Sequence, residues 1–369
     1  MNGSGHPQPP RRKTDERVKQ GISVGLVGAG LQGWRRARAL SDADGDRLVA
    51  VADVDLSAAE RLAGQFGCRA TERWQEVVED PNAAAVLICT PPHLHSEMIT
   101  AAVKLGKHVL CEKPLTHNLE AAKVVLSDAH RSGLTVKCGF NYRHHPGLRQ
   151  AHAWVTEERI GDLMNIRCRH GIGGRPGYEN EWRSQAEISG GGQLMDQGLH
   201  ILDLFRWFLG DFVTASGLVS TSFWPIAPLE DNVFALLSTE GGQVASLHAS
   251  WTQWRNLFSF EVYGRDGYIS VDGLGGSYGT ERVTLGKRAF LEPFREEITE
   301  FRGEDRSWLE EWQEFVSAIR SGHEPLGSGR DGLEAQILAG AIYESAKAGK
   351  VIRVAAGCSA TASAVNEPS

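Results

Sequence analysis

Short apolar runs alternate with longer amphipathic segments from Ile22 to about residue 145. The apolar runs, rich in Val, Ile, Leu and Ala, are ISVGLVG, LVAVAD, AAVLICT, HVLCE and TVKCG. The segments between them carry apolar residues at helical spacing and read LQGWRRARAL, SAAERLAGQFG, HSEMITAAVKLG and NLEAAKVVLSDAHRSG. Apolar strands that alternate with helices are typical of βαβ units whose parallel sheet is buried on both faces. The pattern therefore predicts a doubly wound α/β domain over residues 21–145.

The alternation of strand and helix stops after Pro146. The next apolar stretches are NIRCRHGIGG, ASGLVSTSF, NVFALLST, QVASLHASWT, FSFEVYGRDGYISV and RVTLGKRAFLEPF, joined by glycine-rich turns such as STEGGQ. They predict a large, mostly antiparallel open sheet. Two helical segments follow, RSWLEEWQEFVSAIRSG and DGLEAQILAGAIYESAKAG, which we expect to pack on the first domain or in the groove between domains. We therefore predict a second α/β domain over residues 146–352.

Such an open sheet needs cover on its other face, and a second subunit is one way to provide it. We therefore expect a homo-oligomer, a dimer or tetramer built through the sheet. We interpret the remaining segments, residues 1–20 and 353–369, as tails. The first is rich in proline and charged residues and has no apolar run, so we expect it to be disordered.

Composition excludes several other classes of protein. A chain of 369 residues is longer than one core usually supports, which agrees with two domains. The net charge of -7 argues against nucleic acid or an anionic membrane as the main partner. Six cysteines include no CxxC pair and no spacing that suits zinc, so we expect buried thiols and no metal site. With no apolar run near the roughly 20 residues of a membrane span and no signal-peptide core, the sequence predicts a cytoplasmic protein.

A glycine-rich loop follows the first predicted strand. The stretch GAGLQG places Gly28, Gly30 and Gly33 in the spacing G-x-G-x-x-G, directly after a strand and at the start of a helix. Glycines at this spacing also serve plain tight turns, so the context decides. In a Rossmann dinucleotide-binding domain the first glycine makes the turn, the second lets the backbone approach the pyrophosphate, and the third lets helix and strand pack closely.

Asp53 ends the second predicted strand, about 20 residues after the loop, where such folds place the acid that binds the adenosine ribose. Its charge would repel a 2'-phosphate, and the next residue is the apolar Val54. We therefore predict NAD as the cofactor, with NADP less favoured and Arg61 the nearest cation that would reverse this preference. The alternative is that Asp53 is an ordinary turn residue at a strand end.

Lys113 follows the strand HVLCE in the stretch CEKPLT. A residue before proline takes extended geometry, and a Lys–Pro bond is one of the few that can be cis. The side chain then lies at the carboxyl end of a parallel strand, where open α/β sheets bind ligands. The alternative is a solvated cation.

A polar stripe runs along the apolar helix predicted from GGGQLMDQGLHILDLFRWFLG, which begins at Gly190. Asp196, His200 and Asp203 stand at i, i+4 and i+7, with Gln193 on the same stripe. Periodicity alone leaves two interpretations open, a solvated helix face and a catalytic one. The glycines before the helix suit a close approach of backbone to a ligand.

Taken together, these motifs resemble the glucose-fructose oxidoreductase/inositol dehydrogenase (Gfo/Idh/MocA) family. The resemblance runs in order from about residue 21 to 352 and rests on VGLVGAGLQG, CTPPHLH, GKHVLCEKPLT, FNYRHHP, GGGQLMDQGLHILDLFRWFLG and GLEAQILAGAIYESAKAGK. Family members are mostly NAD(P)-dependent dehydrogenases or reductases of sugars, inositols and related polyols. The resemblance thus implies an oxidoreductase that acts on CH–OH groups of a small polyol, sugar or aminocyclitol.

The resemblance also implies a site. Lys113, Asp196 and His200 would meet at the nicotinamide, with His200 as acid/base, Lys113 stabilising alkoxide character and Asp196 orienting its neighbours. Asp203 would be structural. The family's cofactor contacts correspond here to Gly28, Gly30, Leu31, Gln32, Gly33, Asp53, Cys89, Thr90, Pro92, His95, Glu112 and Lys113.

Substrate residues are harder to assign. By resemblance they are Asp196 and His200 together with Tyr142, Arg143, Trp182 and Arg183, the last four being equally suited to a hinge or core. The last two fall in YENEWRSQAEISGGG, which we expect to be a loop. His144 and His145 replace the apolar residue that often follows NYR in the family, which indicates either a different pocket or solvated loop histidines.

Two other functions stay open. Some relatives cleave glycosides by transient oxidation on bound NAD, and a few have lost catalysis and act as ligand sensors. A sensor would be expected to lose the lysine or histidine, and this chain keeps Lys113, Asp196 and His200, so we rank it last. The sequence leaves open the exact substrate, the direction of reaction and the pathway.

Overall fold

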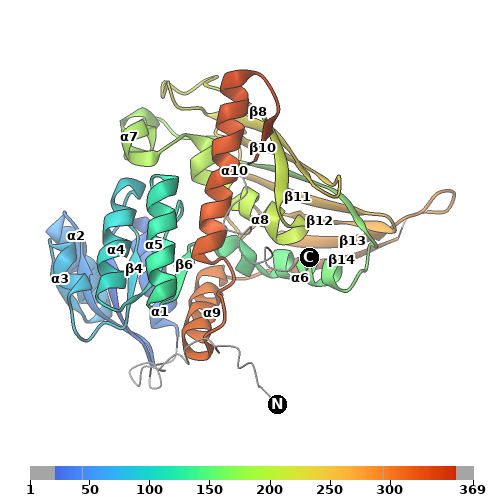
Figure 1. Cartoon of the computed structure of the whole chain (residues 1–369). Helices are drawn as coiled ribbons and strands as arrows, with labels where there is room; N and C mark the ends of the chain where they lie inside the picture. Colours follow the sequence, from blue (N-terminus) through green and yellow to red (C-terminus); the bar gives the residue numbers. More distant parts are fainter. Residues whose placement is uncertain (1–20, 44, 294, 355–369) are drawn as a thin grey trace, which may run out of the picture.

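A computed structural model describes residues 21–43, 45–293 and 295–354 of the chain. The predicted tails, 1–20 and 353–369, lie outside the described residues except for Arg353 and Val354, and Arg353 still belongs to a strand. Figure 1 shows two lobes, a smaller one built around the first sheet and a larger one built around the second, with helix α10 upright between them.

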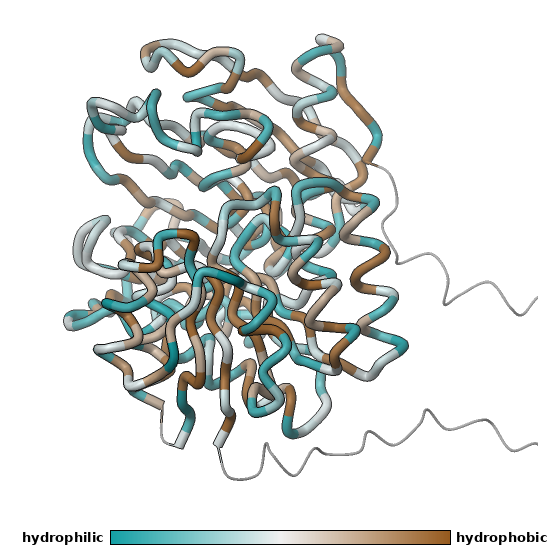
Figure 2. The backbone as a smooth tube through the Cα atoms, turned by 90° about the vertical axis from the view of Figure 1, so that its left-hand side faces the viewer, coloured by the Kyte–Doolittle hydropathy of each residue, from teal (hydrophilic) through white to brown (hydrophobic). Residues whose placement is uncertain are grey.

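The first lobe is the predicted doubly wound domain. All of its strand pairs are parallel, in the spatial order β3-β2-β1-β4-β5-β6. Its strands are β1 (Ser23–Val27), β2 (Arg47–Ala52), β3 (Arg69–Thr71), β4 (Ala85–Ile88), β5 (His108–Cys111) and β6 (Val136–Cys138). Its helices are α1 (Leu31–Ser41), α2 (Leu56–Phe66), α3 (Trp74–Val78), α4 (His95–Lys104) and α5 (Leu119–Arg131). Figure 2 shows the apolar residues gathered on these central strands.

The strand order determines where a ligand can bind. The chain starts in the middle of the sheet, builds outwards through β2 and β3, and then returns to the other side of β1. Ligands of open α/β sheets bind at this reversal, outside the carboxyl ends of the strands. The ends of β1, β4 and β5 lie side by side there. This brings three parts of the chain to one edge: the glycine loop, the segment of Thr90 that follows β4, and Lys113.

The second lobe holds a nine-stranded sheet, in the order β14-β13-β12-β11-β7-β10-β9-β8-β15. Every neighbouring pair is antiparallel except β7 with β10. The mostly antiparallel prediction is therefore confirmed. The strands are β7 (Leu163–Gly171), β8 (Phe212–Ser220), β9 (Asn232–Thr239), β10 (Val244–Ser250), β11 (Leu257–Gly264), β12 (Gly267–Asp272), β13 (Glu281–Lys287), β14 (Glu296–Phe301) and β15 (Ile352–Arg353).

Helices cover one face of this sheet and join the lobes. They are α6 (Pro146–Thr156), α8 (Leu199–Leu209), α9 (Ser307–Ser321) and α10 (Gly329–Ala348). Helix α9 packs on the first lobe, where Trp312 and Phe315 enter the same apolar core as Leu40 of α1. Helix α10 contacts β8 and α8 of the second lobe and α5 and β6 of the first. Both of the last helices therefore contact the first lobe, and α10 also packs on the second.

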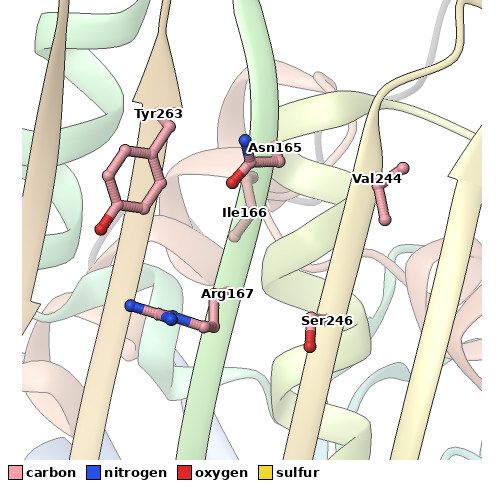
Figure 3. Close-up of a pocket in the computed structure, with 6 residues that line it drawn as sticks. All are labelled: Asn165, Ile166, Arg167, Val244, Ser246 and Tyr263. Carbon is pink, nitrogen blue, oxygen red and sulfur yellow. The ribbon is translucent and has the colours of Figure 1, made fainter.

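The described residues leave the other face of the sheet uncovered. Leu218, Phe234, Leu236 and Val244 lie exposed on the adjacent strands β8, β9 and β10, and their pairing puts them on one face. A pocket beside them is lined by the residues in Figure 3, which are Asn165, Ile166, Arg167, Val244, Ser246 and Tyr263. Within the described part of the chain, no helix is long and apolar enough to cross a membrane.

Candidate active site

The glycine loop has the geometry of a phosphate cradle. Gly28 has φ +99°, and a Cβ there would lie 2.7 Å from the backbone of Cys89. A Cβ on Gly33 would lie 2.0 Å from the carbonyl oxygen of Gly28, so these two glycines are required by packing. Gly30, which begins α1, has open space where its Cβ would be and no side-chain cap. The free amides at this helix start therefore face room for a pyrophosphate, and the loop fits a dinucleotide.

Asp53 ties the end of β2 to this loop. Its Oδ2 accepts a hydrogen bond from the Ala29 amide at 2.6 Å, and its Oδ1 accepts one from the Asp55 amide at 3.0 Å. A carboxylate has about four acceptor positions, so both bonds leave capacity for ribose hydroxyls. Arg61, the cation that would favour NADP, lies 4.0 Å from the Asp55 carboxylate and donates to Ser57 Oγ.

Lys113 and Asp196 form an ion pair between the lobes. The Lys113–Pro114 bond is cis, as the sequence allowed. The Lys113 Nζ lies 2.8 Å from Asp196 Oδ1 and also donates to the Asp196 carbonyl. Burial raises the pKa of Asp196, but the Lys113 charge and then the Arg183 charge outweigh it and hold that pKa below its usual value. The carboxylate is thus ionised at neutral pH.

His200 lies one helical turn further along and is buried. Its ring stacks on Tyr142, with centroids 4.1 Å apart and planes at 11°. The Nδ1 atom is buried and has no hydrogen-bond partner. Burial, and then the charge of Lys113, hold the pKa of His200 well below 6.5. The imidazole is therefore neutral near pH 7 and able to accept a proton.

The helix that carries these residues is not regular. It opens with a π-helical segment, η6 (Leu194–Gly198), before α8 begins. The Glu230 carboxylate accepts hydrogen bonds from the Gly192 and Leu194 amides at 3.2 and 2.9 Å, which satisfies amides at the helix start. A Cβ on Gly192 would lie 2.1 Å from the Glu230 carbonyl oxygen. Gly192 is therefore required by the close approach of Glu230, and the expected approach of these glycines to a ligand stays a prediction.

The polar stripe is not a solvated helix face. His200, Asp203 and Gln193 are buried, and Asp196 is mostly buried. Each has its own neighbour: Asp196 pairs with Lys113, His200 stacks on Tyr142, and Gln193 donates to Gln197 Oε1 at 2.9 Å.

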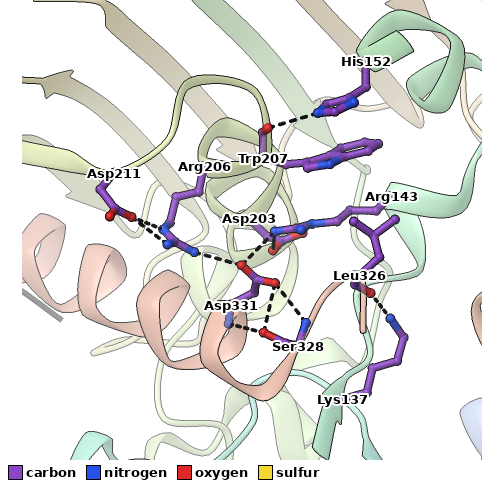
Figure 4. Close-up of polar contacts among 10 residues, drawn as sticks. All are labelled: Lys137, Arg143, His152, Asp203, Arg206, Trp207, Asp211, Leu326, Ser328 and Asp331. Atoms are coloured by element: carbon purple, nitrogen blue, oxygen red, sulfur yellow. Dashed lines mark hydrogen bonds and ion pairs between the residues drawn. The ribbon is translucent and has the colours of Figure 1, made fainter. Parts of the chain in front are cut away.

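Asp203 takes part in a separate ionic network with Arg143, drawn in Figure 4. Arg143 Nε and Nη2 donate to the two oxygens of Asp203 at 2.8 and 2.6 Å, and Nη2 lies 3.2 Å from Asp331 Oδ1. Burial raises the pKa of Asp203 to about 6 despite the Arg143 charge. The Arg143 guanidinium is thus engaged inside the protein. Its partners in this structure are structural ones, as the sequence anticipated for Asp203, and its expected substrate contact stays a prediction.

The segment before the helix of Asp196 and His200 contains several short helical turns. The expected loop contains the 3-10 turns η4 (Tyr178–Asn180) and η5 (Trp182–Ser184) and the short helix α7 (Ala186–Ser189). The Arg183 guanidinium stacks on the Trp182 ring at 4.4 Å, and both side chains are half-buried. The Arg183 charge helps to lower the pKa of Asp196, and the expected substrate role of Trp182 and Arg183 stays a prediction.

Two residues that no sequence motif indicated, His170 and Tyr278, also lie at this site. His170, on β7, is fully buried, and its Nε2 lies 2.8 Å from the Tyr142 hydroxyl. Burial lowers the pKa of His170 to about 3, so it is neutral. The Tyr278 hydroxyl accepts a bond from Gln197 at 3.2 Å, and its ring lies 5.1 Å from that of His170. The sequence did hold one indication of His170. It lies two residues after Cys168 on β7, so both side chains point to the same buried face of the sheet.

Several expected cofactor contacts have partners within the protein. Glu112 accepts two hydrogen bonds from Arg36, at 2.9 and 2.7 Å, and Arg36 also pairs with Glu311. The ring of His95 lies between two backbone carbonyls. Glu112 and His95 thus support neighbouring segments of the protein, and their expected cofactor role stays a prediction. Leu31 and Gln32 open α1, and Cys89, Thr90 and Pro92 follow β4 at the ligand edge.

The two histidines after Arg143 are not solvated. His144 and His145 are both buried. His145 Nδ1 lies 3.2 Å from Glu281 Oε2, and the His145 ring meets Tyr142 edge-on at 5.8 Å. Burial, and then nearby positive charges such as Lys137, lower the pKa of His144 well below 6.5. His145 thus packs against Tyr142, while His144 is buried without a contact to that ring among the aromatic pairs of the described residues.

The described cysteines are free thiols. Cys111, Cys138 and Cys168 are buried thiols, while Cys68 and Cys89 are partly exposed. Cys358 lies outside the described residues. Among the described residues, no group of three or more histidine, cysteine or acidic side chains could hold a metal ion.

Comparison with known proteins identifies the family. The family described as "Oxidoreductase family, NAD-binding Rossmann fold" matches residues 22–140, and "GFO/IDH/MocA C-terminal domain" matches residues 148–270. The chain belongs to the Gfo/Idh/MocA family. This member is therefore an NAD(P)-dependent oxidoreductase whose first lobe is an NAD-binding Rossmann domain.

Known members of the Gfo/Idh/MocA family resemble this chain over most of its length. Levoglucosan dehydrogenase of Pseudarthrobacter phenanthrenivorans is 27% identical, over 89% of this chain and 96% of that protein. Inositol 2-dehydrogenase of Rhizobium meliloti is 28% identical, over 90% of this chain and 99% of that protein. The solved structure of levoglucosan dehydrogenase in complex with NADH and levoglucosan superimposes with a TM-score of 0.83 at 26% identity, over 91% of this chain and all of that one.

Proposed function

We propose that this enzyme oxidises a secondary hydroxyl of a sugar, inositol, aminocyclitol or related polyol, with NAD rather than NADP as its cofactor. The observation that carries the proposal is the Lys113–Asp196 ion pair beside a buried, neutral His200, at the carboxyl edge of the NAD-binding sheet. The names of the relatives, levoglucosan dehydrogenase and inositol 2-dehydrogenase, support the substrate class.

His200 is the general base of the oxidation. A secondary alcohol must lose its hydroxyl proton as its C–H hydrogen leaves as hydride, and a neutral imidazole accepts that proton. NAD, when bound, supplies the acceptor for the hydride. The Tyr142 ring lies flat against the imidazole and limits its rotation, so the ring is oriented before substrate arrives.

Lys113 stabilises the developing alkoxide. Its ammonium carries three N–H donors, and the two bonds to Asp196 leave one for a substrate oxygen. A fixed positive charge at the oxygen that becomes negative stabilises the transition state more than the ground state. Asp196 holds this ammonium in place, and its charge offsets the burial of the lysine.

The preference for NAD rests on Asp53. Its carboxylate is held at the end of β2 by two backbone amides, and Val54 beside it is 91% exposed and offers no cation to a 2'-phosphate. Comparable affinities for NAD and NADP in a binding titration would contradict this preference.

A substrate panel tests the reaction. Purified enzyme and NAD would be incubated with inositols, aldoses, 1,6-anhydro sugars, aminocyclitols and nucleotide sugars, and NADH would be followed at 340 nm. We expect one class to reduce NAD, and Lys113→Met to lose turnover by about 10²- to 10³-fold, the usual loss for an electrostatic group of this kind. Near-normal turnover in Lys113→Met would contradict the proposed roles. Slow cleavage of a glycoside without net NADH would replace the dehydrogenase with the hydrolase.

The uncovered sheet face is the proposed oligomer contact. Leu218 and Phe234 are cross-strand partners on β8 and β9, with Leu236 and Val244 next to them on the same face. A cluster of exposed apolar side chains on a flat sheet is typical of a subunit interface. We propose that a second copy of the chain covers this cluster.

A further inference from the structure

His95 occupies an unusual position behind the active site. It is the first residue of α4, directly after the 3-10 turn η2 (Pro92–Leu94), and it is fully buried. Its Nδ1 lies 2.8 Å from the carbonyl oxygen of Pro114, and its Nε2 lies 2.8 Å from the carbonyl oxygen of Thr90. The ring therefore spans the two segments that leave the sheet after β4 and β5.

The two partners are both acceptors. A backbone carbonyl cannot donate, so each bond needs a proton on the ring nitrogen that faces it. A neutral imidazole carries one N–H and holds one segment, whereas an imidazolium holds both. Burial is the largest effect and holds the pKa of His95 below 6.5. The bonds to the two carbonyls and the Glu112 charge act in the opposite direction, and the His93 charge adds to the lowering. Either form keeps at least one segment attached to α4.

The bridge lies next to Lys113 in the chain. The ladder between β4 and β5 ends with the Glu112 amide, which donates to the Ile88 carbonyl at 2.9 Å. His95 supplies the next link across the gap, at Pro114. Beyond it, Gln336 of α10 donates to the Thr116 carbonyl at 2.7 Å. Lys113 is thus held on both sides along the chain, and its Nζ is held at Asp196.

We propose that His95 is a positioning residue for Lys113, and that its ring sets the distance between the Thr90 segment and the lysine backbone. The inference rests on the proposed role of Lys113. A displacement of about 1 Å in a catalytic group lowers turnover by about 10²-fold. Loss of the bridge should therefore reduce kcat by about 10- to 100-fold and leave KM for the polyol nearly unchanged.

Two variants and a control test the bridge. His95→Gln keeps one donor group, and His95→Phe keeps the ring shape without either bond. His93, two residues earlier and exposed, provides the control His93→Gln. We expect the order of kcat to be wild type, His95→Gln, His95→Phe, with His93→Gln equal to wild type. If both His95 variants retain their thermal transition and wild-type kcat, the inference is overturned.

A double-mutant comparison separates positioning from general damage. If His95 acts through Lys113, then His95→Phe in a Lys113→Met background should lower the residual turnover by less than twofold. Effects that multiply in full would overturn the inference. If Lys113→Met alone turns over normally, the proposed function fails instead, so the two failures are distinguishable.

A spectroscopic measurement needs no turnover. In protein with ¹⁵N-labelled histidine, the His95 ring signals can be assigned by their loss in His95→Gln. We expect one ring N–H that exchanges slowly with solvent at pH 7.5, and a second that appears on acidification below pH 6.5. A His95 ring with no protected N–H would overturn the bridge.

Discussion

At the scale of single residues, the proposed role of His200 predicts the pH range in which the enzyme works. Its pKa lies well below 6.5 because of burial first and the Lys113 charge second. If His200 is the general base, as we propose, oxidation needs the neutral imidazole and activity is lost as the pH falls through that pKa. We predict that the acidic limb of kcat/KM for oxidation lies below pH 6.5. In Lys113→Met, the limb should move to higher pH, because removal of a positive charge raises the pKa of a nearby histidine.

The measurement is initial-rate NADH formation between pH 4.5 and 9. Lys123→Met, at an exposed lysine on α5 of the same lobe, is the control and should leave the limb in place. If the acidic limb does not shift in Lys113→Met, the titration of His200 does not set that limb.

Arg143 illustrates a different residue-scale role. Its guanidinium holds the fully buried Asp203 in its ionised form. Arg143→Met leaves that carboxylate without its partner, so we predict a loss of about 3–5 kcal/mol in the free energy of unfolding. The pKa of Asp203 should rise further above its value of about 6. Denaturant unfolding measures the loss.

The matched control for this prediction is Arg149→Met. Arg149 pairs with Glu310 at 2.5 Å but is 57% exposed, so we expect a change of about 0–1 kcal/mol. A stable Arg143→Met variant with a greatly raised KM would support the substrate role that the sequence suggested.

At the scale of elements, the glycine loop combines two kinds of constraint. Gly33 is enforced by the backbone of the loop, whereas Gly30 faces open space. We predict that Gly30→Ala folds normally and lowers NAD affinity by about tenfold or more, because its methyl group occupies room needed by the pyrophosphate. Gly64→Ala, on α2 and also in open space, is the control and should stabilise the protein by up to about 1 kcal/mol with NAD affinity unchanged.

Calorimetric titration with NAD separates the two variants. Equal NAD affinity in Gly30→Ala and wild type would contradict the assignment of this loop to the phosphates.

Elements with strong periodicity were predictable, and weakly patterned ones were not. The apolar strands of both lobes and helices α1, α2, α4, α5, α8, α9 and α10 were expected from the sequence, but α6 was not, although it is as long as α1. By contrast, β3 is a three-residue edge strand and β14 is a largely exposed, glutamate-rich strand, and neither carries a clear apolar pattern. The π-helical segment η6 was also missed, because a local change of helical register depends on what caps and packs against the helix, here Glu230.

At the scale of the whole molecule, the exposed apolar face of the second sheet leads us to predict that the protein forms an oligomer through this face. If a second copy covers the apolar cluster of β8 to β10, Leu236→Lys should shift the mass measured by light scattering towards the monomer. Leu236 is 54% exposed in the single chain. Leu291→Lys, at a fully exposed leucine near the turn before β14, is the control and should leave the mass unchanged.

A wild-type protein that is monomeric at micromolar concentration would contradict this interface. A stable oligomer that Leu236→Lys does not weaken would place the contact elsewhere on the surface.

The amino-acid sequence by itself determined the two-lobe plan and the glycine loop. These properties are local, since the period of apolar residues selects strand or helix, and a short spacing of glycines with a following acid describes one turn and one strand end. The motifs also placed Lys113, Asp196 and His200 together, although only through resemblance to a family.

Only the tertiary structure decided which buried polar groups meet. Lys113 and Asp196 are 83 positions apart in the chain, and Arg143 and Asp203 are 60 apart. Periodicity assigned Asp196 and Asp203 to one stripe, yet packing gave them different partners. His170 entered the site without any motif. The physical reason is that a buried charge or imidazole takes its role from its neighbours, and those neighbours are chosen by how the elements pack.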